Sequence, residues 1–66
     1  MYQIQGFNPA ETKGKWENIG RAIKDLEKAE FVMEGVKETY ARLEKFADNK
    51  TTIRLFNKQN KTVVLL

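Results

Sequence analysis

A long amphipathic pattern over residues 25–48 is the strongest structural signal in this chain. Apolar side chains recur there at alternating steps of three and four residues, which places them on one stripe of a helix. The stripe consists of Leu26, Ala29, Met33, Val36, Tyr40, Leu43 and Ala47. Asp25 can cap the first helical turn, and Asn49 tolerates the left-handed turn that often closes a helix. The sequence therefore predicts one helix from Asp25 to Asp48.

Short stretches with a two-residue period flank this helix. Tyr2 and Ile4 alternate with glutamines, which predicts a strand over residues 2–7. Turn residues follow, and residues 15–20 are predicted to return beside the first strand as a hairpin with a long loop.

Residues 15–23 also permit a second interpretation. The spacing of Trp16, Ile19 and Ile23 fits a helix, which would then begin as early as Glu17. Glycines on either side of the tryptophan favour the strand.

The C-terminal part predicts a second hairpin, with strands over residues 52–56 and 63–66 joined by a polar turn. The expected fold is α+β, a single domain of residues 1–66 with element order ββαββ. Two hairpins form a small antiparallel sheet, and the helix stripe packs on one face of it. The helix side is expected to carry Ile4, Ile53 and Leu55, and the partly open face Gln3, Gln5, Arg54 and Phe56.

The composition argues against an enzyme. The chain has no histidine and no cysteine, so the usual general base, the thiolate nucleophile and the common zinc ligands are missing. Its four glycines are scattered, so no phosphate-binding glycine loop is present. We predict a protein without catalytic residues, metal or cofactor.

Size limits how this domain gains stability. A chain of 66 residues buries only about 60% of the surface that it exposes when unfolded. Without disulfides or zinc, tight helix–sheet packing and self-association into a homodimer are the remaining routes. No segment is apolar enough to span a membrane, and the first residues lack a secretory pattern. A cytoplasmic location is therefore expected.

The outer surface of the predicted helix has two candidate protein contacts. The first is an acidic row made of Glu27, Glu30, Glu34 and Glu38. Like charges one turn apart cost about 0.2–0.5 kcal/mol per pair, so the row is either a solvated face or a surface for a basic partner. The second is Phe31, about 160° from the centre of the stripe, with Gly35 beside it. Phe31 is a contact anchor unless the loop of residues 8–15 or a bend at Gly35 covers it.

Residues 63–66 are all apolar, so neither face of that strand is polar. Burial on both faces is typical of a strand between two layers, yet only one helix is predicted. We expect Val64 and Leu66 to meet a second subunit or a partner strand. The alternative is a strand tucked under the N-terminal hairpin.

Charge is distributed unevenly along the chain. Residues 1–48 contain eight Lys or Arg and nine Asp or Glu, whereas residues 49–66 contain four Lys or Arg and no acid. Basic and aromatic residues on an exposed sheet hold nucleic-acid strands through phosphate contacts and stacking. Such a surface would comprise Lys50, Arg54, Phe56, Lys58 and Lys61. Lysine also guards exposed strand edges, so nucleic-acid binding is the alternative to protein binding.

Turn and cap segments recur in a familiar combination: Gly6-Phe7-Asn8-Pro9, Gly14-Lys15-Trp16, Leu26-Glu27-Lys28-Ala29 and Arg54-Leu55-Phe56-Asn57. In these segments the chain resembles short uncharacterised ββαββ proteins encoded by bacteriophages and mobile elements. The resemblance implies a protein that binds and blocks a host or defence protein in the host cytoplasm. We therefore predict a small protein-binding protein. The alternatives are a nucleic-acid-binding module and a structural subunit of a larger assembly.

Overall fold

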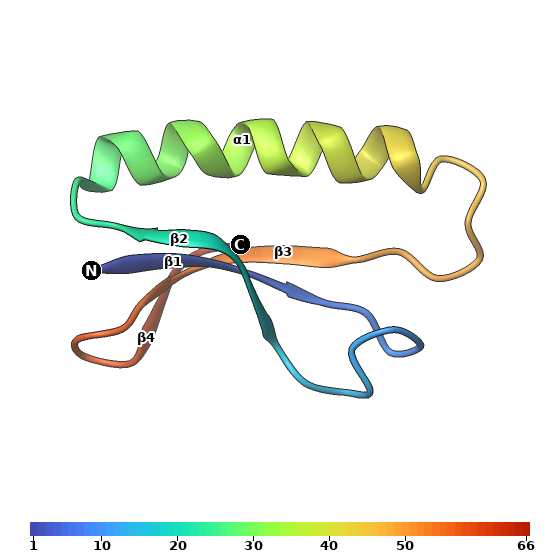
Figure 1. Ribbon diagram of the computed structural model, residues 1–66, viewed down its shortest axis with the longest axis horizontal. Helices are drawn as coiled ribbons and strands as arrows, with labels where there is room; N and C mark the ends of the chain where they lie inside the picture. The colour runs from blue at the N-terminus through green and yellow to red at the C-terminus, as the bar shows by residue number, and fades with distance from the viewer.

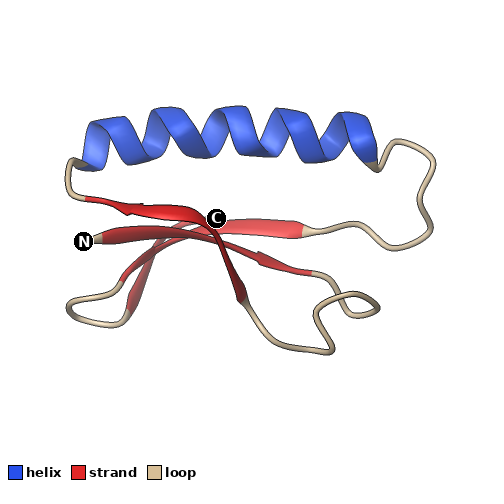
Figure 2. Cartoon of the chain, viewed as in Figure 1, coloured by secondary structure: helices blue, strands red, loops and turns tan.

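The computed structural model describes residues 1–66 and confirms the α+β fold with element order ββαββ (Figure 1). Its elements are β1 (Tyr2–Phe7), β2 (Glu17–Ile23), α1 (Leu26–Leu43), β3 (Thr52–Asn57) and β4 (Thr62–Leu65). The strands form one antiparallel sheet in the order β2-β1-β3-β4, with β1 and β3 side by side at its centre. The helix lies on one face, and no second layer covers the other (Figure 2). No helix of the structure is both long enough and apolar enough to cross a membrane.

The core lies between the central strands and the middle of α1. Alternate residues of β1 and β3 point towards the helix, and the helix stripe meets them there. The buried apolar side chains are Ile4, Ala29, Met33, Ile53 and Leu55. Partly buried residues packed around them are Tyr2, Ile19, Ile23, Val32, Val36 and Tyr40. The predicted packing of the helix stripe on this face of the sheet is confirmed for its middle part.

The start of the helix is as predicted, but its end is not. Asp25 is the N-cap, and its carboxylate accepts a hydrogen bond from the Glu27 backbone N–H. The helix ends at Leu43, five residues before the predicted Asp48. Glu44 is the C-cap, and its carboxylate accepts two hydrogen bonds from Thr51, the residue before β3.

The two ends of the helix stripe are less buried than the sequence pattern predicts. Leu43 is 76% exposed and Leu26 is 37% exposed, and Ala47 lies beyond the helix. The physical reason is length, since an 18-residue helix spans about 27 Å and a six-residue strand only about 20 Å. The last helical turn therefore projects past the strands beneath it (Figure 1).

Residues 17–23 form a strand, so the strand interpretation is right and the helical one is wrong. The strand begins after Trp16, two residues later than predicted. It is irregular, because three of its residues lie opposite Gln3 between two regular pairs. Gly20 provides the positive φ of +70° that this irregularity uses.

Gln3 lies opposite Phe56 on the open face, as predicted, but its side chain is buried there. Its side-chain amide donates to the carbonyls of Ile4, Ile19 and Gly20 at 3.0–3.2 Å. These bonds fill the gap that the irregular β1–β2 ladder leaves, so the buried amide is satisfied.

Candidate functional site

Strand β4 forms one free edge of the sheet. It pairs with β3 and with no other strand, so the backbone groups on its outer side have no strand partner. Leu65 lies opposite Leu55 on the helix side, while Val63 lies opposite Phe56 on the open face. The extra residue between them, Val64, forms a bulge that moves the following residue to the other face. The strand therefore presents Val63 on the open face and Leu65 on the helix side, so an apolar side chain lies on each face.

The apolar side chains of residues 63–66 are 36–71% exposed. The strand is not tucked under the N-terminal hairpin, because β1 and β3 separate it from β2. The alternative prediction for this segment is therefore wrong. Nothing in a single copy of the chain buries Val64 or Leu66 on two sides.

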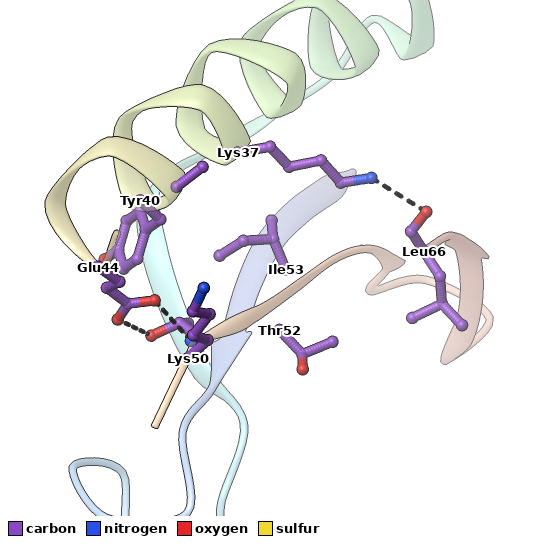
Figure 3. A pocket seen from close by; sticks show the side chains of 9 residues that line it. Lys37, Tyr40, Glu44, Lys50, Thr52, Ile53 and Leu66 are labelled. Atoms are coloured by element: carbon purple, nitrogen blue, oxygen red, sulfur yellow. Dashed lines mark hydrogen bonds between the residues drawn. The ribbon is translucent and has the colours of Figure 1, made fainter. Parts of the chain in front are cut away.

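A groove of about 380 Å³ lies between the second half of α1 and β3 (Figure 3). Its walls are Lys37, Tyr40, Ala41, Glu44, Lys50, Thr51, Thr52, Ile53 and Leu66. Lys37 Nζ donates to the Leu66 carbonyl at 3.1 Å and so links the helix to the residue after β4. At the other end Glu44 accepts hydrogen bonds from the backbone N–H and the hydroxyl of Thr51.

These two hydrogen bonds determine the electrostatics of Glu44. The Thr51 backbone N–H lowers the pKa of the Glu44 carboxyl most, followed by the Thr51 hydroxyl and the charge of Lys50. Partial burial opposes this change. The carboxylate holds the loop after the helix against the start of β3.

The acidic row lies partly on the helix flank that looks towards β4. Lys37 and Ala41 line the groove that Leu66 closes. Glu30 precedes Lys37 by seven residues and Glu34 precedes Ala41 by seven, which is nearly two full turns, so each pair shares a line along the helix. Of residues 62–66, only Leu66 reaches this flank, through the Lys37 hydrogen bond, because the helix packs on β1, β2 and β3 and not on β4. No three acidic side chains converge in a way that would hold a metal ion.

Phe31 is 81% exposed on the outer face of the helix, so neither the loop nor a bend covers it. It points away from the β4 edge and does not form one surface with it. No atom lies within 4 Å of the position that a Cβ atom on Gly35 would take, so this glycine does not make room for a closely packed neighbour. Leu43, which the stripe was expected to place against the sheet, is exposed at the end of the helix, and so is Phe46 just beyond it.

The open face of the sheet carries an aromatic cluster around Arg54. Its guanidinium carbon lies 4.0 Å from the centre of the Trp16 ring and 4.9 Å from that of Phe56. Arg54 Nε donates to Gln5 Oε1 at 2.9 Å, and Gln5 lies directly opposite it on β1. Phe7 packs against Trp16 with ring centres 5.4 Å apart.

The structure only partly assembles the predicted nucleic-acid surface. Arg54 and Phe56 share the open face, and Lys58 and Lys61 lie in the turn between β3 and β4. Lys50 does not join them, because it lines the groove on the helix side. Trp16 and Phe7 also belong to this surface, although no local spacing in the sequence connects them with a strand more than 30 residues later.

No known family model, curated protein or solved structure matches this chain. The functional inference therefore depends on the geometry of these surfaces.

Proposed function

We propose that this protein is a small non-catalytic protein-binding module that holds an extended segment of another protein along β4. The supporting observation is the free edge of β4, which combines unpaired backbone groups with apolar side chains exposed on both faces. Residues 62–66 contain no charge and no proline, the usual guards of such an edge. An added strand would pair with this backbone and cover these side chains.

The helix flank that Leu66 reaches through Lys37 suggests the chemistry of the partner. Glu30 and Glu34 are exposed along it, and neither accepts a hydrogen bond from a basic group of this chain. A partner strand with basic side chains on its helix side would neutralise them and gain specificity. We therefore expect a partner segment that is apolar along its backbone and positively charged on one side.

Such a module acts by occupying a segment that its partner needs for another purpose. This agrees with the inhibitory role that the resemblance to bacteriophage and mobile-element proteins implies. The host or defence protein that carries the segment would be found in the cytoplasm of the host cell.

The test compares affinity capture from host lysate by the wild-type protein, Val64→Lys and a control variant. Lysine in the middle of β4 places a charge on the interface and guards the edge. Thr39→Lys adds the same charge on an exposed position of the opposite helix flank. We expect Thr39→Lys to retain the partner in equimolar amount and Val64→Lys to lose it, with unchanged melting temperatures.

Two further measurements separate the outcomes. Hydrogen exchange of residues 62–66 should slow in the complex, because added pairing protects strand amides. Equal partner recovery with wild type and Val64→Lys would exclude the β4 edge. The other possible occupant of the β4 edge is a second copy of this chain, which sedimentation of the pure protein would detect as a dimer. Forms larger than a dimer would indicate a structural subunit of a larger assembly.

A further inference from the structure

The open face of the sheet presents a rigid, partly free guanidinium. Trp16 and Phe56 lie against the Arg54 side chain, and Gln5 accepts the hydrogen bond from its Nε. Its two terminal nitrogens have no hydrogen-bond partner in the chain, and neither is buried. Three contacts therefore orient the planar group, while its terminal N–H groups remain available in solvent. This is the donor geometry that binds phosphate oxygens in pairs.

Charge is divided between the two sides of the sheet. Seven of the nine acidic residues belong to the helix, its caps or the loop that follows. The other two, Glu11 and Glu17, line a pocket together with Tyr40 of the helix. Towards the open face the chain instead contributes Arg54, with Lys58 and Lys61 in the adjoining turn. No acidic residue offsets these three cations there.

The aromatic rings beside Arg54 retain exposed surface. Trp16, Phe56 and Phe7 are all partly exposed, although the guanidinium shields the first two. No second layer covers this face (Figure 2). Flat aromatic surface next to a fixed cation suits unpaired bases, which stack on rings while their phosphates contact Arg and Lys. A duplex hides its base faces and does not fit this arrangement.

We infer that the open sheet face binds single-stranded nucleic acid, independently of the β4 edge. Arg54 contacts a phosphate through its terminal nitrogens, Lys58 and Lys61 contact phosphates further along the strand, and a base stacks on the ring surface of the aromatic cluster that the guanidinium leaves exposed. The helix side, which carries the acidic residues, takes no part.

Trp16 is the only tryptophan in the chain, so its fluorescence reports directly on this surface. We would titrate the protein with an oligothymidylate of about 15 nucleotides, first at about 50 mM and then at about 200 mM salt. Saturable quenching is expected at the lower salt. Three phosphate contacts on a single strand give a slope of about −2 for log affinity against log salt.

Arg54→Gln should lower the affinity about tenfold or more, because it removes a phosphate contact and loosens the stack. Arg42→Gln is the matched control, since it removes the same charge from the helix side and should leave the affinity unchanged. If Arg54→Gln does not fold, the double variant Lys58→Gln, Lys61→Gln tests the same surface. It should reduce the salt slope to about −0.7.

Several results would overturn this inference. The first is the absence of tryptophan quenching at about 50 mM salt. The second is an equal loss of affinity in Arg54→Gln and Arg42→Gln. The third is binding of a duplex or of polyglutamate that is as tight as the binding of oligothymidylate. Val64→Lys adds a positive charge at the sheet edge and leaves the stack intact, so it should still quench. Loss of partner capture without loss of quenching would therefore separate the two surfaces.

Discussion

The carboxylate of Glu44 accepts two hydrogen bonds from Thr51, one from the backbone N–H at 2.7 Å and one from the hydroxyl at 2.6 Å. The Thr51 hydroxyl oxygen also accepts a hydrogen bond from the Asn8 side chain at 3.3 Å. One glutamate thus joins the end of the helix, the start of β3 and the loop after β1. The loop of residues 45–50 is held at both ends by this contact.

Glu44→Gln should lower the free energy of unfolding by about 1 kcal/mol at pH 7, because it replaces a charged acceptor by a neutral one. The folded pKa of Glu44 lies below its ordinary value of 4.5. Its contribution is therefore complete above that value and disappears as the pH falls through the folded pKa. Urea unfolding should show a difference from wild type at pH 7 that closes in strong acid. Glu38→Gln on the exposed helix is the control, and an equal effect there would contradict the role of Glu44.

Gly35→Ala should stabilise the protein by about 1 kcal/mol. The glycine lies in the middle of an uninterrupted helix, and an added methyl group would meet no atom within 4 Å. The gain should raise the melting temperature by about 4–8 °C for a domain of this size. Ala41→Gly, the reverse change on the same helix, should produce a loss of similar size. A destabilised Gly35→Ala protein would show that the backbone there is not free to accept a side chain.

Met33→Ala should bring the domain close to its unfolding transition at room temperature. Met33 is fully buried at the centre of the core, and such truncations cost about 2–5 kcal/mol. A chain of 66 residues has only about 3–10 kcal/mol of stability in total. Circular dichroism melting would measure the loss. Met33→Leu conserves the volume and should cost less than about 1.5 kcal/mol.

Glu34→Lys should weaken the partner bound at β4 about fivefold, because it reverses a charge on the helix flank that Leu66 reaches through Lys37. Phe31→Ala should leave the affinity unchanged, since its ring lies on the outer helix face. Association rates measured at two salt concentrations would show whether the effect of Glu34 is electrostatic. A large loss with Phe31→Ala would instead move the binding surface to the outer helix.

Hydrophobic periodicity was sufficient to predict the element order and the packing partners. Ile4 and Ile53 lie in the core, as the two-residue period of their strands predicts. Met33 lies there too, as the three-to-four-residue period of the helix predicts. Asp25 was recognisable as a cap because its chemistry acts within one turn of the backbone. These features depend on neighbours close in sequence, which is the information that a pattern contains.

The errors arose where distant contacts override local preference. Leu43 and Ala47 continue the helical spacing, but the helix ends at Leu43, and the Glu44 carboxylate binds Thr51 seven residues later. The burial of Gln3 depends on an irregularity in the neighbouring strand. The placement of Trp16 beside Arg54 depends on two loops and the pairing of β1 with β3. No single segment of the sequence contains these relationships.

The central position of β1 in the sheet has a consequence for how the chain folds. It precedes the other three strands in the chain, yet its neighbour β3 lies some fifty residues later and supplies Ile53 and Leu55 to the core. A nascent chain that ends after the helix still lacks the core residues that β3 contributes. We therefore expect folding to be all-or-none and to wait for β3, so that the protein acquires its two surfaces in a single late step.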